Sequence, residues 1–236
     1  MSNPYFKFKQ FTVFHDKCAM KVGADGVTLG AWTDVAETEN LLDVGTGSGL
    51  IALMLAQRCN AQITMIDIDN ECVTQATENA EHSPWKDRIS AIHSSFQDFA
   101  EKSTQEFDLI VCNPPFFINS FQSPSETRTT ARHNNTLSQA DLISCSKKLL
   151  SDTGRLCLIL PISEGNQFLL LAKKSGLFCS KKTSVFPNYE KAAKRLLLEF
   201  KKTNVPCTES NLTIEQERNI YTPEYAEFVK IFYLKL

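Results

Sequence analysis

The chain has 236 residues, 42% of them hydrophobic and 22% charged, which is the composition of a soluble globular protein with room for one α/β domain. It contains no apolar stretch as long as a membrane span, and its first ten residues alternate aromatic residues with lysine instead of forming a signal-peptide pattern. We therefore expect one cytoplasmic, monomeric domain over residues 1–236, with an N-terminal segment 1–35, a core 36–202 and a C-terminal segment 203–236.

The eight cysteines are scattered singly along the chain, and no two have C-x-x-C spacing. Zinc sites and redox motifs need such close pairs. We therefore expect no metal site, and cysteines that mostly serve as small core residues in a reducing compartment.

The net charge of −2 hides a strong asymmetry. Residues 23–119 carry 4 basic against 15 acidic residues, net −11, whereas residues 120–202 carry 14 against 6, net +8. Basic surface attracts phosphate backbones, so this asymmetry favours a nucleic-acid partner. The alternative is that the Lys-Lys pairs of the basic segment only solvate the ends of helices and strands.

The first predicted element is a strand over Tyr5 to Phe11, with one aromatic face packed on the domain and with Lys7 and Lys9 pointing outward. From Asn40 onward strand-like and helix-like segments alternate, which is typical of a mostly parallel sheet with helices on both faces. Seven core strands are expected, at 41–44, 62–66, 88–92, 107–112, 155–160, 178–185 and 196–200. Helices are expected at 48–57, 70–81, 138–150, 164–174 and from Thr222 into 228–234.

A glycine-rich loop follows the first core strand, with Asp43 before Gly45, Gly47 and Gly49. Glycine lets the backbone turn sharply and lets a ligand approach without a Cβ in the way. The G-x-G-x-G spacing differs from the dinucleotide-binding G-x-G-x-x-G and resembles motif I of class I S-adenosylmethionine-dependent methyltransferases. The resemblance implies that Asp43 faces the amino-acid end of that cofactor; the alternative is a plain tight turn.

The next strand, 62–66, is followed by Asp67, 22 residues beyond Gly45. A carboxylate at this position can accept hydrogen bonds from both ribose hydroxyls of a nucleoside cofactor. Asp69 is the competing candidate, but it looks like the cap of the following helix. We therefore assign Asp67, with its neighbour Ile68, to the cofactor site.

The methyltransferases that share motif I usually place an acidic residue for the adenine amine after the third strand. This chain has Ser95 and Phe96 there, with Asp98 slightly further on. Phe96 is expected to cover the adenine face, and the polar adenine contact falls to Ser95 or to a backbone group.

The tetrapeptide Asn113-Pro114-Pro115-Phe116 ends the strand 107–112. Two prolines cannot continue a sheet ladder, so the chain must turn out rigidly at the strand's carboxyl end. The sequence resembles the N-P-P-[YF] motif of methyltransferases that act on a conjugated amine. There the asparagine oxygen and the Pro114 carbonyl each accept one N–H, and the aromatic ring stacks on the substrate.

The whole chain resembles the bacterial tRNA1(Val) adenine-N6 methyltransferase family, whose fold is the Rossmann-like class I methyltransferase fold. The resemblance lies in residues 6–11, 15–26, 29–32, 83–85, 113–116, Arg128, Arg132 and 221–234. It implies S-adenosylmethionine as the cofactor and the anticodon loop of a tRNA as the partner, with methyl transfer to N6 of adenosine 37.

The resemblance also implies roles for residues outside the core motifs. The segment 15–30 would close over the cofactor, with Lys21 and Asp25 as contacts, and Arg128 and Arg132 would hold RNA phosphates. The outward-facing Lys7 and Lys9 are further RNA candidates. Three alternatives stay open: a guanine-N2 or glutamine-N5 methyltransferase, because the aromatic ring of the motif does not separate amine substrates; a non-catalytic RNA-binding protein; and a dehydrogenase.

Overall fold

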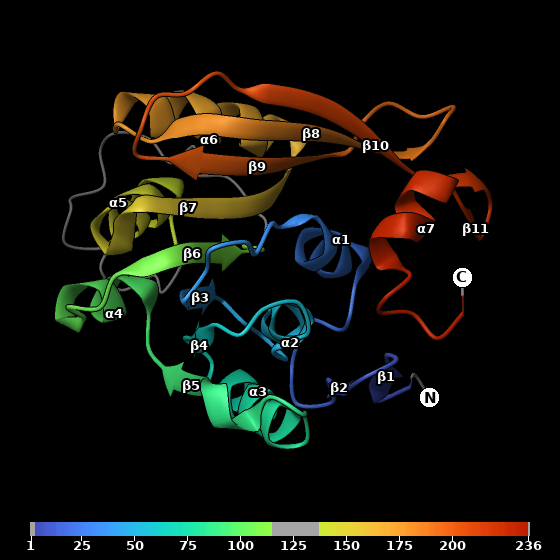
Figure 1. Ribbon diagram of the computed structural model, residues 1–236, viewed down its shortest axis with the longest axis horizontal. Helices are drawn as coiled ribbons and strands as arrows, with labels where there is room; N and C mark the ends of the chain where they lie inside the picture. The colour runs from blue at the N-terminus through green and yellow to red at the C-terminus, as the bar shows by residue number, and fades with distance from the viewer. Residues whose placement is uncertain (1–2, 115–136, 236) are drawn as a thin grey trace, which may run out of the picture.

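The computed structural model describes residues 3–114 and 137–235, and its main feature is one large twisted sheet (Figure 1). In the described residues this sheet has nine strands in the order β11-β10-β8-β9-β7-β6-β3-β4-β5. The strands are β3 (Asn40–Val44), β4 (Gln62–Asp67), β5 (Ile89–His93), β6 (Phe107–Cys112), β7 (Leu150–Pro161), β8 (Phe178–Asn188), β9 (Arg195–Lys201), β10 (Thr208–Glu217) and β11 (Ile220–Tyr221).

All seven expected strands are present, but the expected number was wrong because β10 and β11 extend the sheet. The sequence does not predict β10, because Leu212 is its one buried residue and polar residues surround it, so no apolar alternation marks the strand. Strands β3 to β7 are mutually parallel, β9 runs antiparallel between β7 and β8, and β10 is parallel to β8. The sheet is thus mostly parallel, as expected.

Helices cover both faces of the sheet and enclose two hydrophobic cores (Figure 1). One face carries α1 (Ala24–Trp32), α2 (Leu50–Ala56), α3 (Asn70–Glu81) and α7 (Pro223–Val229). The other face carries α4 (Phe96–Lys102), α5 (Gln139–Leu149) and α6 (Ile162–Lys174). In the part of the chain that the structure describes, none of these helices is long and apolar enough to cross a membrane.

The N-terminal aromatic segment is a hairpin and not the single strand that its alternation predicts. β1 (Tyr5–Lys7) pairs with β2 (Thr12–Phe14), and the Phe8 N–H donates to the Phe11 carbonyl at 2.9 Å to close the turn. Phe8 and Phe11 are buried and stacked at 4.6 Å, while Tyr5 and Phe6 remain about 40% exposed. Only the turn end of the aromatic face is therefore buried in the core.

Helix α1 was not expected from the sequence. Every residue from Gly26 to Trp32 is buried, so the helix has no polar face and shows no amphipathic period. The last helix, α7, begins at the predicted Thr222 cap, but it ends at Val229 and does not reach residue 234.

Candidate cofactor and amine site

A cleft of about 290 Å³ opens at the carboxyl ends of β3, β4 and β6. This edge is where open α/β sheets bind ligands. Residues from six separated stretches of sequence line the cleft: Cys18, Ala19, Met20, Val44, Gly45, Gly47, Ile66, Asp67, Ile68, Asp69, Cys72, Ser94, Ser95, Phe96, Gln97, Cys112, Asn113, Pro114 and Leu137. The cleft thus brings most of the predicted cofactor residues together with the predicted amine-binding residues.

The glycine loop forms one wall of this cleft. Gly45 and Gly47 have φ angles of 66° and 55°, and nothing lies within 4 Å of the position a Cβ would occupy at either residue. The space beside them is therefore open to a ligand. At Gly49 a Cβ would meet Met65 and Ala76 at about 3.4 Å, and this glycine does not line the cleft. Gly49 serves the packing of the strand-to-helix turn.

Asp43 lies beneath the glycine loop and is fully buried. Its Oδ2 accepts hydrogen bonds from Thr46 Oγ1 at 2.7 Å and from the Ala52 N–H at 3.2 Å, whereas its Oδ1 has no partner in the described structure. Burial raises the pKa of Asp43 to about 7, although the hydrogen bond from Thr46 opposes this. Asp43 is not among the residues that line the cleft, so its unsatisfied oxygen would reach a cationic ligand group through an intervening water.

Asp67 stands at the end of β4 with its carboxylate at the glycine loop. Its Oδ2 accepts the Gly47 N–H at 2.8 Å and its Oδ1 accepts the Asp69 N–H at 2.9 Å. Each carboxylate oxygen has a second lone pair, so both can still accept a ribose hydroxyl. Asp69 is the N-cap of α3, since its side chain accepts the Glu71 N–H. The geometry thus supports the choice of Asp67 over Asp69.

Phe96, which is expected to cover the adenine face, lines the cleft together with Ser95, the side chain expected to make the polar adenine contact. Phe96 and Ile68 both line the cleft. Ser95 is the N-cap of α4, and its hydroxyl donates to Asp98 Oδ2 at 2.7 Å while accepting the Asp98 N–H. The Ser95 hydroxyl is therefore engaged within the helix cap. Gln97, which the sequence did not single out, also lines the cleft, and its Nε2 donates to Asp141 Oδ2 at 3.3 Å.

Asn113 and Pro114, which directly follow β6, also line the cleft. Asn113 is half-buried, and its Nδ2 lies 4.0 Å from the Cβ position of Gly26 on α1. A larger residue at position 26 would crowd both Leu50 and Asn113. The unexpected helix α1 thus packs beside the predicted amine-binding residue. Pro115 and Phe116, which complete the motif, lie outside the described residues.

The segment before α1 runs along the cleft and is held to α3 by hydrogen bonds. Asn79 bonds both the N–H and the carbonyl of Phe14, and the Lys17 N–H donates to Gln75 Oε1 at 3.1 Å. As a result, Cys18, Ala19 and Met20 form part of the cleft wall. They belong to segment 15–30, which the family resemblance implies would close over the cofactor. Lys21 and Asp25 are not in that wall, and Asp25 instead pairs with Arg195 at 2.8 Å.

The predicted RNA residues are only partly described. Arg128 and Arg132 lie outside the described residues. Lys7 is exposed on the N-terminal hairpin. The Lys9 ammonium donates a hydrogen bond to the Lys230 carbonyl at 2.6 Å. This bond joins the N-terminal hairpin to the C-terminal segment, so Lys9 has a partner within the fold.

Metal ligands do not gather in the described part of the chain: no three His, Cys, Asp or Glu side chains there come together as they would around an ion. All eight cysteines are free thiols.

Comparison with known proteins decides the family. Residues 29–174 match the family model described as "Methyltransferase small domain". A Trichodesmium erythraeum protein named tRNA1(Val) (adenine(37)-N6)-methyltransferase is 47% identical over 238 aligned positions, which cover all of both chains. A Parabacteroides distasonis protein of the same name is 46% identical, again over the full length of both chains. This chain belongs to the tRNA1(Val) (adenine(37)-N6)-methyltransferase family.

Solved structures similar to this family member are also methyltransferases. A predicted O-methyltransferase from Agrobacterium tumefaciens superimposes with a TM-score of 0.67 at 18% identity, covering 87% of this chain and 95% of that one. The T. thermophilus 16S rRNA N2 G1207 methyltransferase, in complex with AdoMet and guanosine, gives a TM-score of 0.59 at 19% identity over 84% of this chain and 50% of that one. These likenesses confirm the class I methyltransferase fold.

Proposed function

We propose that this protein transfers a methyl group from S-adenosylmethionine to the exocyclic N6 of adenosine 37 in tRNA1(Val). The observation that carries the proposal is that one cleft joins Gly45, Gly47 and Asp67 to Asn113 and Pro114. Full-length relatives that are 41–47% identical and bear this activity in their names support the choice of substrate.

The residues present fit the cofactor. The Asp67 carboxylate retains lone pairs for the two ribose hydroxyls, and the space beside Gly45 and Gly47 is open. The unpartnered Oδ1 of Asp43 suits the cationic amino-acid end. When bound, S-adenosylmethionine supplies the methyl group as an electrophilic sulfonium methyl.

Asn113 and Pro114 would orient the substrate amine. An exocyclic adenine nitrogen is planar and a poor nucleophile, because its lone pair is delocalised into the ring. The Asn113 side-chain oxygen and the Pro114 carbonyl would each accept one N–H, which fixes the amine for direct in-line transfer. No strong base is required before transfer, since the amine proton becomes acidic once the methyl is attached and is then lost to water. The leaving group is the neutral thioether S-adenosylhomocysteine. Phe116 would stack on the flipped base.

The anticodon loop, with adenosine 37 turned out of its stack, is the proposed partner in the cytoplasm, and a monomer is the proposed state. Arg128, Arg132 and Lys7 are the proposed phosphate contacts. Lys21 remains a proposed cofactor contact.

A methyl-transfer assay on three substrates tests this function. Purified protein with labelled S-adenosylmethionine is offered total tRNA, ribosomal RNA and a release factor. We expect label in tRNA alone. Label in ribosomal RNA or in the release factor, with none in tRNA, would support the guanine-N2 or glutamine-N5 alternative instead.

A further inference from the structure

The lysine pairs that make residues 120–202 basic are largely occupied within the fold. The ammonium of Lys147 donates to the Ser175 carbonyl at 2.7 Å, and that of Lys202 donates to the Leu150 carbonyl at 2.6 Å. Lys182 pairs with Glu209 at 3.1 Å, and Lys181 lies 4.4 Å from the centre of the Trp32 ring. These four lysines thus have partners at the ends of helices and strands. This agrees with the alternative explanation of the charge asymmetry, in which the lysine pairs solvate those ends.

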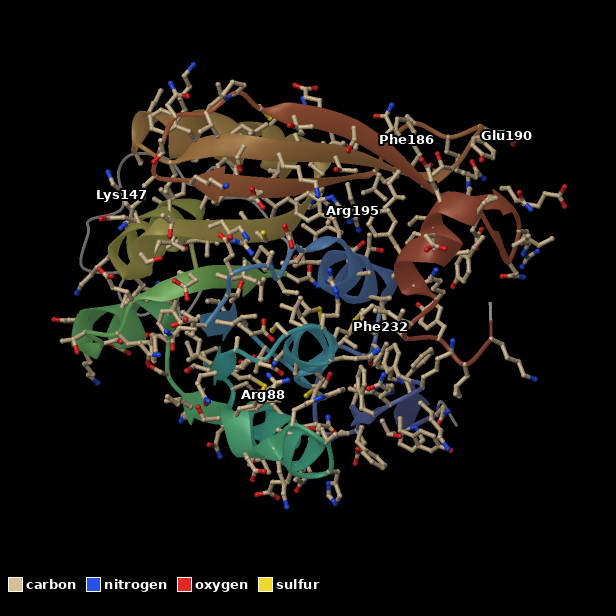
Figure 2. The ribbon with its side chains drawn as sticks, in the orientation of Figure 1. Arg88, Lys147, Phe186, Glu190, Arg195 and Phe232 are labelled. Atoms are coloured by element: carbon tan, nitrogen blue, oxygen red, sulfur yellow. The ribbon has the colours of Figure 1, made fainter. Side chains whose placement is uncertain are left out.

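They also lie away from the cleft. Lys147 is in the last turn of α5, which leads into the amino end of β7, and Lys202 follows the carboxyl end of the antiparallel β9. Both positions are at the amino edge of the parallel strands, opposite the cleft. Figure 2 shows Lys147 on the opposite side of the molecule from Glu190.

One basic and aromatic hairpin does extend from the cleft edge. Pro161, at the carboxyl end of β7, pairs with Arg195 at the start of β9, so the β8–β9 loop lies beyond the same edge as the ends of β3 and β6. This loop, residues 189–194, carries Tyr189, Lys191 and Lys194, all three exposed, with Tyr189 at 69%. In the described residues neither lysine forms an ion pair, and Glu190 is the one acidic residue of the loop.

The loop is held in one conformation by its own hydrogen bonds. Asn188 Oδ1 accepts the N–H groups of Glu190 at 3.2 Å and of Lys191 at 3.0 Å, and the Lys194 N–H donates to the Val185 carbonyl at 2.9 Å. An ordered turn presents an aromatic ring and two cations with little loss of backbone entropy on binding.

The base of the hairpin lies close to the amine site. Arg195 forms the 2.8 Å ion pair with Asp25 in the first turn of α1. The next residue, Gly26, is the one whose Cβ position lies 4.0 Å from Asn113 Nδ2. Figure 2 shows Arg195 above α1, with Phe186 and Glu190 further out along the hairpin.

We propose that the β8–β9 hairpin is an RNA-docking arm, in which Lys191 and Lys194 bind backbone phosphates and Tyr189 stacks on an unpaired base of the loop that presents the target adenosine. The inference rests on the proposed function. Aromatic stacking on a single-stranded base and charge contacts to phosphates are the two interactions by which proteins hold RNA loops.

Two variants test the arm, and each has a matched control. Lys191→Ala/Lys194→Ala removes two positive charges at the cleft edge; Lys86→Ala/Lys102→Ala removes two exposed charges at the amino edge of the sheet. Tyr189→Ala removes the ring, and Tyr189→Phe keeps it. The measurements are tRNA affinity across a series of salt concentrations, KM for tRNA and the Kd for S-adenosylmethionine.

We expect the hairpin lysine variant to lower the slope of log affinity against log salt by about 1.4 to 1.8, which corresponds to two lost phosphate contacts. Tyr189→Ala should raise KM for tRNA about tenfold, and Tyr189→Phe should restore it. Cofactor Kd should not change in any variant. If wild-type protein methylates tRNA, but the hairpin variants have the same salt slope and KM for tRNA as the amino-edge control, the docking-arm proposal is refuted and the proposed function stands. If wild-type protein transfers no methyl to tRNA, both fall.

Discussion

The backbone N–H of Gly47 donates a hydrogen bond of 2.8 Å to Oδ2 of Asp67. This contact joins the loop after β3 to the end of β4, so the two predicted halves of the cofactor site hold each other in place. The carboxylate is consequently oriented before any ligand arrives, which lowers the cost of binding.

Asp67→Ala should weaken S-adenosylmethionine binding by roughly 10-fold to 100-fold, because hydrogen bonds to a charged group are worth about 1.5–3 kcal/mol. Isothermal titration calorimetry measures this directly. The matched control is Asp69→Ala, which removes the α3 cap and should lower the free energy of unfolding by about 1 kcal/mol with little effect on Kd. The reverse pattern would assign the ribose contact to Asp69.

Asn113→Ala should abolish methyl transfer and leave the Kd for S-adenosylmethionine within a few fold of wild type. The physical reason is that the lost side-chain oxygen positions the substrate amine and not the cofactor. Single-turnover kinetics and calorimetry separate the two effects. An equal loss of transfer and of cofactor binding would mean that Asn113 serves the cofactor or the fold.

The burial of Asp43 should make stability depend on pH. Its folded pKa of about 7 lies above the ordinary value of 3.8, so the folded protein binds this proton more tightly than the unfolded chain. The contribution is complete below about pH 4 and is lost as the pH rises through about 7. Relative to Asp43→Asn, the wild-type free energy of unfolding should fall by at most about 1.4 kcal/mol per pH unit in that window. Urea unfolding of both proteins at several pH values measures the difference, and a constant difference would show that Asp43 titrates normally.

Asp25→Ala distinguishes the predicted cofactor contact from the observed ion pair. The pair with Arg195 is partly exposed, so its loss should lower the free energy of unfolding by no more than about 1 kcal/mol. We expect the Kd for S-adenosylmethionine to stay within about twofold of wild type, since Asp25 does not line the cleft. A tenfold weaker Kd in calorimetry would restore the role implied by the family resemblance.

The sequence predicts the core of this fold well, because its parallel strands are apolar runs that end in informative residues. Asp43, Asp67 and Asn113 each follow or end such a run, and parallel topology brings their strand ends to one edge. The caps at Asp69 and Thr222 are likewise local, since each side chain bonds a backbone N–H two or three residues further on.

Other elements depend on tertiary contacts that no local pattern records. Helix α1 is buried from Gly26 onward and so lacks a period, whereas β10 is polar and pairs only because β8 offers it an edge. The glycines of the loop also have different surroundings, although the motif treats them alike. The space beside Gly45 is open, whereas a Cβ at Gly49 would meet Met65.

The position and the kind of the methylated nucleotide decide whether this protein is an adenine-N6 methyltransferase of tRNA1(Val). Unmodified tRNA1(Val) transcript is incubated with the protein and labelled S-adenosylmethionine, digested and analysed by mass spectrometry, beside a transcript with guanosine in place of adenosine 37. We expect N6-methyladenosine at position 37, none in the substituted transcript and none with Asn113→Ala. Methylation of a guanine, or of an adenosine elsewhere in the tRNA, would contradict the proposed function.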